Sequence, residues 1–298
     1  MTTVLTSLMS LKIMKGIKKK LIVIYGPTAS GKTSLAIKLA KQYNTEIISA
    51  DSRQFFKEMR IGTAVPSKSE LESVKHHFIQ HISIHDDYNV GIFEAQASKL
   101  IYSLFEKHNT LILVGGSGLY IDALCYGLDK FPEIEPAIRQ SLRNEYSLKG
   151  KIWLQNEVGK LDPIFLKNAD RNNHQRLLRC LEVCIQSGQP FSNFLNKKKK
   201  DKPFDLLFKS IQLDRDMLYD RINKRVDEMM DLGLLDEVEQ LIPFKHHNAL
   251  QTVGYKELFA YLNNETNLND AVDLIKRNSR RFAKRQITWL KKYPVEWV

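Results

Sequence analysis

The stretch that decides the fold is KLIVIY at residues 20–25 followed by GPTASGKT at residues 26–33. The six apolar and β-branched residues predict a buried parallel strand, and residues 33–43 carry apolar side chains at helical spacing. A glycine-rich loop between such a strand and helix directs backbone N–H groups at phosphate oxygens. We therefore predict a diphosphate or triphosphate site, with the Lys32 ammonium on the phosphates and the Thr33 hydroxyl on Mg²⁺.

The segments on both sides of this loop alternate between strand and helix patterns. Strands are expected at 46–51, 111–114 and 204–213, and helices at 93–108, 216–232, 234–241 and 270–292. This order predicts an α/β fold, a P-loop NTPase-like parallel sheet flanked by helices. Residues 129–200 show helical periodicity and few strand signals, which predicts an inserted all-helical domain. The expected parts are a flexible basic N-terminal extension at 1–20, a P-loop core domain at 21–128 and 201–298, and the helical insertion domain at 129–200.

Positive charge is concentrated in two places. The formal net charge is +11, and residues 139–200 hold 13 Lys/Arg against 5 Asp/Glu. Residues 276–292 hold 8 basic residues and no acidic one, and Arg277, Arg281 and Arg285 recur every four residues there. Such stretches are typical of a nucleic-acid footprint, although each is also compatible with a solvated helix face.

Other features of the composition favour a cytoplasmic protein. No apolar run reaches the roughly 20 residues that span a bilayer, so no membrane partner is expected, with a membrane-surface helix in the first 20 residues as the alternative. The lysines at 12–20 follow the apolar residues at the chain start, which is the reverse of a signal peptide. The three cysteines, Cys125, Cys180 and Cys184, are interpreted as reduced buried thiols, with a metal pair as the alternative.

Two turns at strand ends are candidates for chemistry. Asp51 closes the second expected strand beside the phosphate loop, where a carboxylate serves as a general base, a helix cap or an outer magnesium ligand. The third strand ends in Gly115-Gly116-Ser117-Gly118 instead of the acid that an NTPase needs to hold its metal. That turn either binds a ligand or only connects strand to helix. Four histidines, His76, His77, His81 and His85, have loose spacing and are interpreted as ordinary polar groups rather than metal ligands.

Eight motifs in preserved order resemble the tRNA dimethylallyltransferases, also called tRNA isopentenyltransferases or the IPP transferase family. The resemblance runs from about residue 21 to residue 289. The motifs are GPTASGKT at 26–33, ISADSRQ at 48–54, IGTAVPS at 61–67, GGSGLY at 115–120, NNHQRLLRCLEV at 172–183, LYDRINKRVDEMMDLGLLDEV at 218–238, QTVGYKEL at 251–258 and AKRQITWL at 283–290.

The resemblance implies a reaction and a set of site residues. Such enzymes move a dimethylallyl group from dimethylallyl diphosphate to N6 of adenine 37, in the tRNA anticodon stem-loop, with Mg²⁺. They are usually monomeric. The implied catalytic residues are Asp51, Ser117, Arg221 and Lys32. The implied diphosphate-binding residues are Gly26, Pro27, Thr28, Ala29, Ser30, Gly31, Lys32 and Thr33. The implied tRNA-binding residues are Asp51, Ser52, Arg53, Gln54, Ser117, Arg139, Gln175, Arg176, Leu177, Leu178, Arg179, Gln251, Thr252, Val253, Gly254, Tyr255 and Lys256.

Ser117 departs from the family's usual threonine but keeps a hydroxyl. Arg221 and residues 175–179 can also be read as exposed helix positions. Three other functions compete with prenyl transfer to tRNA. They are an ATP-dependent small-molecule kinase, a P-loop RNA-binding protein without catalysis, and an adenylate isopentenyltransferase that acts on a free nucleotide. The extended basic stretches favour tRNA over a free nucleotide, because a nucleotide needs no long cationic surface.

Overall fold

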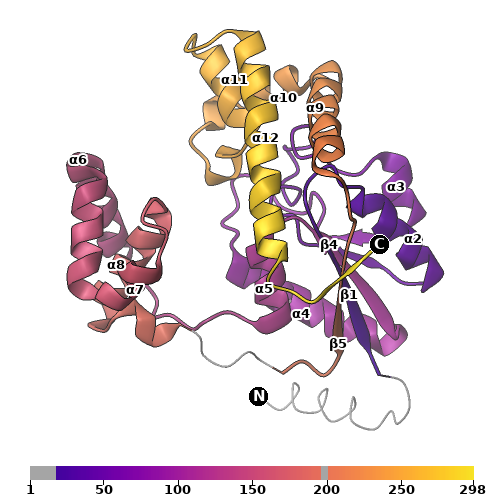
Figure 1. Ribbon diagram of the computed structural model, residues 1–298, viewed down its shortest axis with the longest axis horizontal. Coiled ribbons are helices and arrows are strands. Elements are labelled where there is room, and N and C mark those ends of the chain that lie inside the picture. Colours follow the sequence, from indigo (N-terminus) through magenta and orange to yellow (C-terminus); the bar gives the residue numbers. More distant parts are fainter. Residues whose placement is uncertain (1–17, 196–200) are drawn as a thin grey trace. The chain divides into compact units, whose positions relative to one another are not determined.

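The computed structural model describes residues 18–195 and 201–298 (Figure 1). Residues 1–17 of the expected N-terminal extension and residues 196–200 of the expected insertion domain lie outside these residues. The chain divides into two compact units, one that ends at Tyr126 and resumes over Lys202–Val298, and one over Gly127–Asp201. The sequence placed these divisions at 128/129 and 200/201. Lys18 to Lys20, expected in a flexible extension, instead join the first unit: Lys20 begins a strand, and Lys18 Nζ lies 2.5 Å from Asp205 Oδ1.

The first unit is built on a parallel sheet with the strand order β3-β2-β4-β1-β5-β6. Every pairing is parallel, and the ladder between β1 and β4 runs from Lys20↔Thr110 to Tyr25↔Gly115. The strands are β1 (Lys20–Tyr25), β2 (Ile47–Ser49), β3 (His76–His77), β4 (Thr110–Gly115), β5 (Asp205–Ser210) and β6 (Val295–Trp297). The central strands are buried on both faces, which is why they read as continuous apolar runs.

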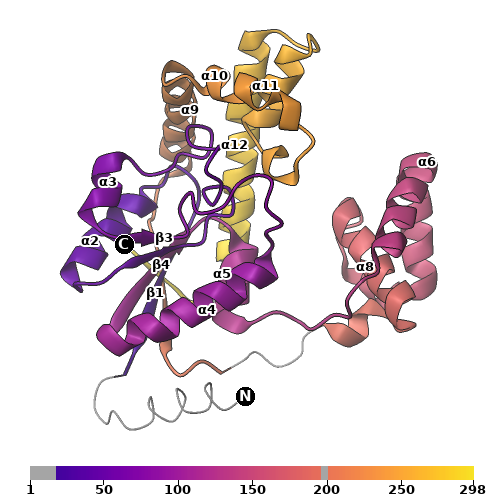
Figure 2. The ribbon, with the colours of Figure 1, turned by 180° about the vertical axis from the view of Figure 1, so that it is seen from behind.

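Helices cover both faces of this sheet (Figures 1 and 2). Alternate side chains of β1 divide between the faces: Ile22 and Ile24 pack with Ala36 and Ala40 of α2 (Lys32–Gln42). Leu21 and Val23 pack with α4 (Val90–Lys107) and α5 (Gly118–Tyr126) on the other face. This two-sided arrangement is the expected P-loop NTPase-like architecture.

A group of helices near the end of the chain completes the first unit. They are α9 (Arg215–Asp231), α10 (Leu234–Gln240), α11 (Tyr255–Leu262) and α12 (Leu268–Leu290). Their apolar faces share one cluster with residues of the loop after β2, including Phe56 and Met59. Helix α12 contacts α9, α11 and α5, so it reaches from this cluster to the sheet (Figure 1).

The second unit is helical, as the sequence predicted. It contains α6 (Pro136–Leu161), which is interrupted at Gly150, together with α7 (Pro163–Asn168), α8 (His174–Ser187) and a short 3-10 turn at Phe191–Phe194. Its core joins Leu154 and Val158 of α6 to Leu177 and Leu181 of α8. This unit therefore has a hydrophobic core of its own.

Five α-helices and strands among the described residues have no counterpart among the expected ranges. They are α3 (Lys68–Ser73), α5, α11 and the two edge strands β3 and β6. β3 and β6 have two and three residues, too few for an alternating pattern to be recognised. No helix among the described residues is both long and apolar enough to cross a membrane.

Candidate active site

The phosphate loop folds as its glycines require. β1 ends at Tyr25, and Gly31 caps α2 with φ 94°, a left-handed conformation that favours glycine. Lys32 opens the helix, and its Nζ donates to the carbonyl oxygen of Pro27 at 2.6 Å. The ammonium therefore lies over the loop, where the sequence placed the phosphates.

A cavity of about 970 Å³ lies beside this loop, within the first unit. Residues from the phosphate loop, the ends of β2 and β4, the loop at 62–66, α9, the segment after Leu250, and α12 line it. Five lining residues are basic and two are acidic; they are Lys32, Arg53, Arg225, Lys256 and Arg285, and Asp51 and Glu257. The surplus of positive charge fits an anionic ligand.

Asp51 lines this cavity, and its carboxylate accepts from the Arg53 N–H at 3.1 Å. Burial raises the pKa of Asp51, opposed by that N–H and by the charge of Lys32. Burial likewise lowers the pKa of Lys32 to about 8, with Asp51 raising it and Arg225 lowering it further. A carboxylate with a raised pKa is a stronger base, so this pair suits proton removal beside bound phosphate.

Ser117 connects the segments that follow β2 and β4. Its hydroxyl accepts from the Ser52 N–H at 2.9 Å and donates to the Ser52 hydroxyl at 3.0 Å. The Ser117 N–H in turn donates to the carbonyl of Ala50. The Gly-Gly-Ser-Gly turn thus faces the cavity and holds the segment that carries Asp51.

The structure places Arg225, rather than Arg221, in the cavity. Arg221 is exposed and does not line the cavity, whereas Arg225 lies one helical turn later and donates to the Thr28 hydroxyl at 3.4 Å. The motif at 218–238 contains both arginines, and Ile222 and Val226 of this helix are buried. The apolar residues could have distinguished the two, because Arg225 stands beside the buried stripe at the position nearest the loop.

Arg53 and Gln54 hold the walls of the cavity. The Arg53 guanidinium donates to the carbonyl oxygens of Asn248 and Ala249, both at 2.9 Å. The Gln54 amide donates to the carbonyls of Thr63 and Ala64 at 3.0 and 2.9 Å. These side chains line the cavity while they position the two loops around it.

The segment 251–256 also lines the cavity, with one exception. Gln251, Thr252, Val253, Gly254 and Lys256 face it, whereas Tyr255 is fully buried. The Tyr255 hydroxyl donates to Glu237 Oε1 at 2.6 Å. A direct tRNA contact by the Tyr255 side chain is therefore corrected to a packing role.

Glu237 was not expected at the site. Its carboxylate accepts from the N–H groups of Arg60, Ile61 and Gly62 at 2.9, 2.7 and 3.0 Å. It thereby fixes the loop whose residues 62–64 line the cavity. The acidic position in the motif at 218–238 was the available signal, but the sequence does not reveal which backbone it caps.

The expected tRNA-binding residues of the second unit are arranged on and around α8. Gln175 and Arg176 are exposed, whereas Leu177 is fully buried in the core of the unit, which corrects its side chain to a packing role. Arg179 and Arg139 share the carboxylate of buried Glu182, at 3.0 and 3.5 Å. Leu178 is half-buried and packs against the same core.

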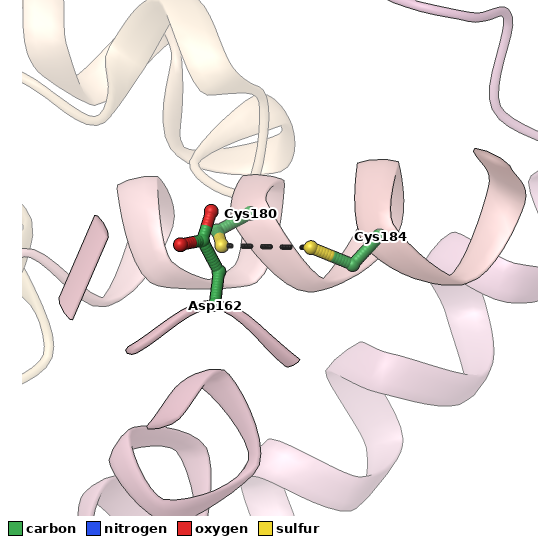
Figure 3. Close-up of side chains that lie close together, drawn as sticks. All are labelled: Asp162, Cys180 and Cys184. Carbon is green, nitrogen blue, oxygen red and sulfur yellow. Dashed lines mark hydrogen bonds between the residues drawn. The ribbon is translucent and has the colours of Figure 1, made fainter. Parts of the chain in front are cut away.

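The three cysteines are buried and unpaired. In α8, Cys180 and Cys184 lie on successive turns with their sulfurs 4.0 Å apart, and Figure 3 shows the Asp162 carboxylate beside them. These three residues could hold a metal ion together. However, the carboxylate already accepts from Phe165 N, Ser192 N and Ser192 Oγ at 2.8, 2.6 and 3.1 Å. Its burial is explained by capping α7 and by holding the turn at 191–194.

The four histidines have separate surroundings. His77 Nε2 lies 2.5 Å from Glu46 Oε2, and His76 Nδ1 bonds the carbonyl of Val74 at 2.8 Å. His81 packs among aromatic rings, and His85 packs against Phe244 and His247. Within the described ranges they do not form a group of three metal ligands.

For magnesium, the relevant groups are oxygens. The Thr33 hydroxyl and the Asp51 carboxylate line the same cavity as Lys32. Hard oxygen donors of this kind, beside a place for phosphate, fit Mg²⁺.

Comparisons with known proteins point to one family. The model of the IPP transferase family matches residues 54–293. The chain is 55% identical to the tRNA dimethylallyltransferase of Christiangramia forsetii, over 93% of this chain and 92% of that one. It is 52% identical to the tRNA dimethylallyltransferase of Flavobacterium psychrophilum, over 91% of each.

Solved structures show the same likeness. A tRNA isopentenylpyrophosphate transferase from Bacillus halodurans is 36% identical with a TM-score of 0.69, over 94% of this chain and 90% of that one. A eukaryotic dimethylallyltransferase acting on tRNA is 28% identical with a TM-score of 0.76, over 91% and 70%. The motifs, the parallel sheet and these matches together place the chain in the IPP transferase family.

Proposed function

We propose that this protein transfers the dimethylallyl group of dimethylallyl diphosphate to N6 of adenine 37 in tRNA and releases diphosphate. The observation that carries the proposal is Asp51 beside Lys32, where both residues line a cavity with a surplus of basic residues. A base next to a phosphate site suits attack by an amine on a carbon that bears a diphosphate leaving group.

In the proposed reaction a bond forms between adenine N6 and the allylic carbon, and the bond from that carbon to oxygen breaks. The diphosphate leaves with the electron pair. The N6 proton passes to the Asp51 carboxylate. Asp51 is suited to this because burial raises its pKa while Lys32 keeps the ionised form available.

The leaving diphosphate needs preorganised donors. We assign this to the N–H groups of residues 26–33, to Lys32 and to Arg225, which reaches the Thr28 hydroxyl. Mg²⁺, held by Thr33, supplies further positive charge to the diphosphate when it is bound. Ser117 then orients the segment of Asp51 through its two hydrogen bonds with Ser52.

For the acceptor, we propose that an anticodon loop presents an unstacked adenine to the cavity. The exposed Gln175 and Arg176, the segment at 251–256 and the basic face of α12 would contact the RNA. We also propose that the protein acts in the cytoplasm and that it is a monomer. Light scattering of the purified protein tests the oligomeric state.

The deciding experiment incubates the protein with labelled dimethylallyl diphosphate, Mg²⁺ and an anticodon stem-loop that carries adenosine at position 37. The proposal expects label in the RNA, found by mass spectrometry as the N6-dimethylallyl nucleoside. A stem-loop with guanosine at that position is the matched control and should stay unlabelled. Unlabelled RNA together with phosphate transfer from ATP to a metabolite would support the kinase instead, and label in free AMP would support the nucleotide prenyltransferase.

A further inference from the structure

One buried polar side chain in α12 has no role in the function described so far. Gln286 is 4% exposed, and the other residues that α12 buries are Ala271, Ile275, Ala283 and Leu290. A buried amide is unfavourable unless both of its arms are hydrogen-bonded. Both are: its Oε1 accepts from the Thr28 N–H at 2.8 Å, and its Nε2 donates to the Gly116 carbonyl at 2.9 Å.

The two partners of Gln286 belong to different parts of the site. Thr28 lies in the phosphate loop after β1, and Gly116 lies in the turn after β4. The backbone ladder that joins β1 to β4 stops at Tyr25↔Gly115, so no described strand pairing holds the two turns beyond that point. Gln286 joins them there, with one hydrogen bond to each.

The surroundings are shaped for this amide. A Cβ added at Gly116 would lie 2.3 Å from Gln286 Nε2 and 3.7 Å from Asp51 Oδ2. Glycine at 116 therefore gives the amide room to approach, close to the carboxylate of Asp51. The Tyr25 hydroxyl also donates to the backbone carbonyl of Gln286 at 3.3 Å, which seats this turn of α12 against β1.

Thr28 is held from two sides. Gln286 Oε1 accepts a hydrogen bond from the Thr28 N–H, and Arg225 donates to the Thr28 hydroxyl at 3.4 Å. The start of the phosphate loop is thus fixed by α12 and α9, two helices far along the chain. A change at Gln286 shifts the loop relative to both Arg225 and the turn that carries Ser117.

We propose that Gln286 is a positioning residue that fixes the position of the diphosphate-binding loop relative to the turn after β4, beside Asp51. The inference rests on the proposed function. Gln286 acts through the Thr28 N–H and the Gly116 carbonyl. Because small displacements of reacting groups reduce rates strongly, its loss should lower kcat by roughly tenfold to a hundredfold.

The first test uses Gln286→Met, which keeps the length of the side chain and removes both hydrogen bonds. We expect kcat to fall by roughly tenfold to a hundredfold. The Kd of inorganic diphosphate with Mg²⁺, measured by calorimetry, should rise several-fold, while the Kd for tRNA stays within about twofold. Thr288→Val is the matched control, since Thr288 lies on the exposed side of the same helix and bonds only the Lys284 carbonyl.

The second test uses Gln286→Glu. The introduced carboxyl can accept from Thr28 N–H, but it can donate to the Gly116 carbonyl only when it is protonated. The ratio of variant to wild-type kcat should therefore rise as pH falls through the pKa of that carboxyl. The Asp51 carboxylate lies close to this position, so the diphosphate Kd of the variant is measured at the same pH values and should improve in parallel as pH falls. This variant also decides the matter if Gln286→Met does not fold.

Three results overturn the proposal. The first is a folded Gln286→Met protein whose kcat and diphosphate Kd stay within about twofold of wild type. The second is a Gln286→Met protein that loses kcat, diphosphate affinity and tRNA affinity equally and has a lowered Tm. The third is a ratio of variant to wild-type kcat for Gln286→Glu that does not change with pH. If the wild type transfers no prenyl group, the proposed function fails. The diphosphate Kd of Gln286→Met still tests the link between the amide and the loop.

Discussion

The arginines of the two units have different partners. In the first unit, Arg53 and Arg225 donate to carbonyl and hydroxyl oxygens that carry no formal charge. In the second unit, Arg139 and Arg179 share the carboxylate of Glu182. A neutral partner positions a guanidinium and leaves its charge for a ligand, whereas a carboxylate partner neutralises part of it. The cavity arginines are therefore prepared for an anion, and those at Glu182 contribute first to the fold of their unit.

Among the variants that test this difference between the arginines, a change at Arg225 is expected to have the largest effect. We predict that Arg225→Gln lowers kcat by roughly 10²- to 10³-fold, the size of effect seen when one donor to a developing anion is removed. Steady-state prenyl transfer to the stem-loop measures it. Arg221→Gln, on the exposed face of the same helix, is the control and should change kcat by less than about threefold. Equal losses in both variants would contradict the assignment.

The pKa of Lys32 gives the next prediction. Its folded pKa is lowered to about 8, so the free protein loses this charge as pH rises through that value. Binding that requires the protonated amine should then weaken by up to about tenfold per pH unit above 8. Calorimetric titration with diphosphate from pH 7 to 9.5 measures the slope. Lys32→Met should bind more weakly at pH 7 and lack this dependence; a wild-type slope equal to that of Lys32→Met would exclude Lys32 as the group.

A smaller effect is expected in the second unit. Glu182→Gln removes the charge that Arg139 and Arg179 share, and we predict a loss of about 1–3 kcal/mol in the free energy of unfolding. Urea unfolding followed by circular dichroism measures it. Affinity for tRNA should not fall, because the variant gains one net positive charge. A large loss of kcat in a fully folded Glu182→Gln protein would mean that the two units do not differ as described.

The sequence predicted much of the fold because its strongest patterns are local. The run at 20–25 and the glycine loop after it specify a strand, a turn and a helix within 23 residues, and the structure has them at Lys20–Tyr25 and Lys32–Gln42. The short strands β3 and β6 were missed, since pairing with neighbours rather than their own pattern defines them.

The candidate site was harder to predict in detail. Asp51 and Ser117 follow the ends of β2 and β4, Lys32 follows the loop after β1, and strand order brings these ends together. Arg225, Glu237 and Gln286 act through contacts with residues far away in the chain. Their motifs therefore indicate that these residues matter but do not show which residues they contact. The choice of Arg221 over Arg225 followed the resemblance, whereas the apolar residues of the same motif place Arg225 nearer to the buried side of the helix.

The most direct test of the account is the rate of prenyl transfer by Asp51→Asn. This change keeps an oxygen that can accept from the Arg53 N–H and removes the base. Single-turnover transfer with saturating stem-loop and dimethylallyl diphosphate should slow by roughly 10²- to 10⁴-fold, while the Kd for tRNA stays within about twofold. Asp87→Asn, at an exposed position, should behave as wild type. A rate for Asp51→Asn within about threefold of wild type would contradict the account, because Asp51 would then not be the base.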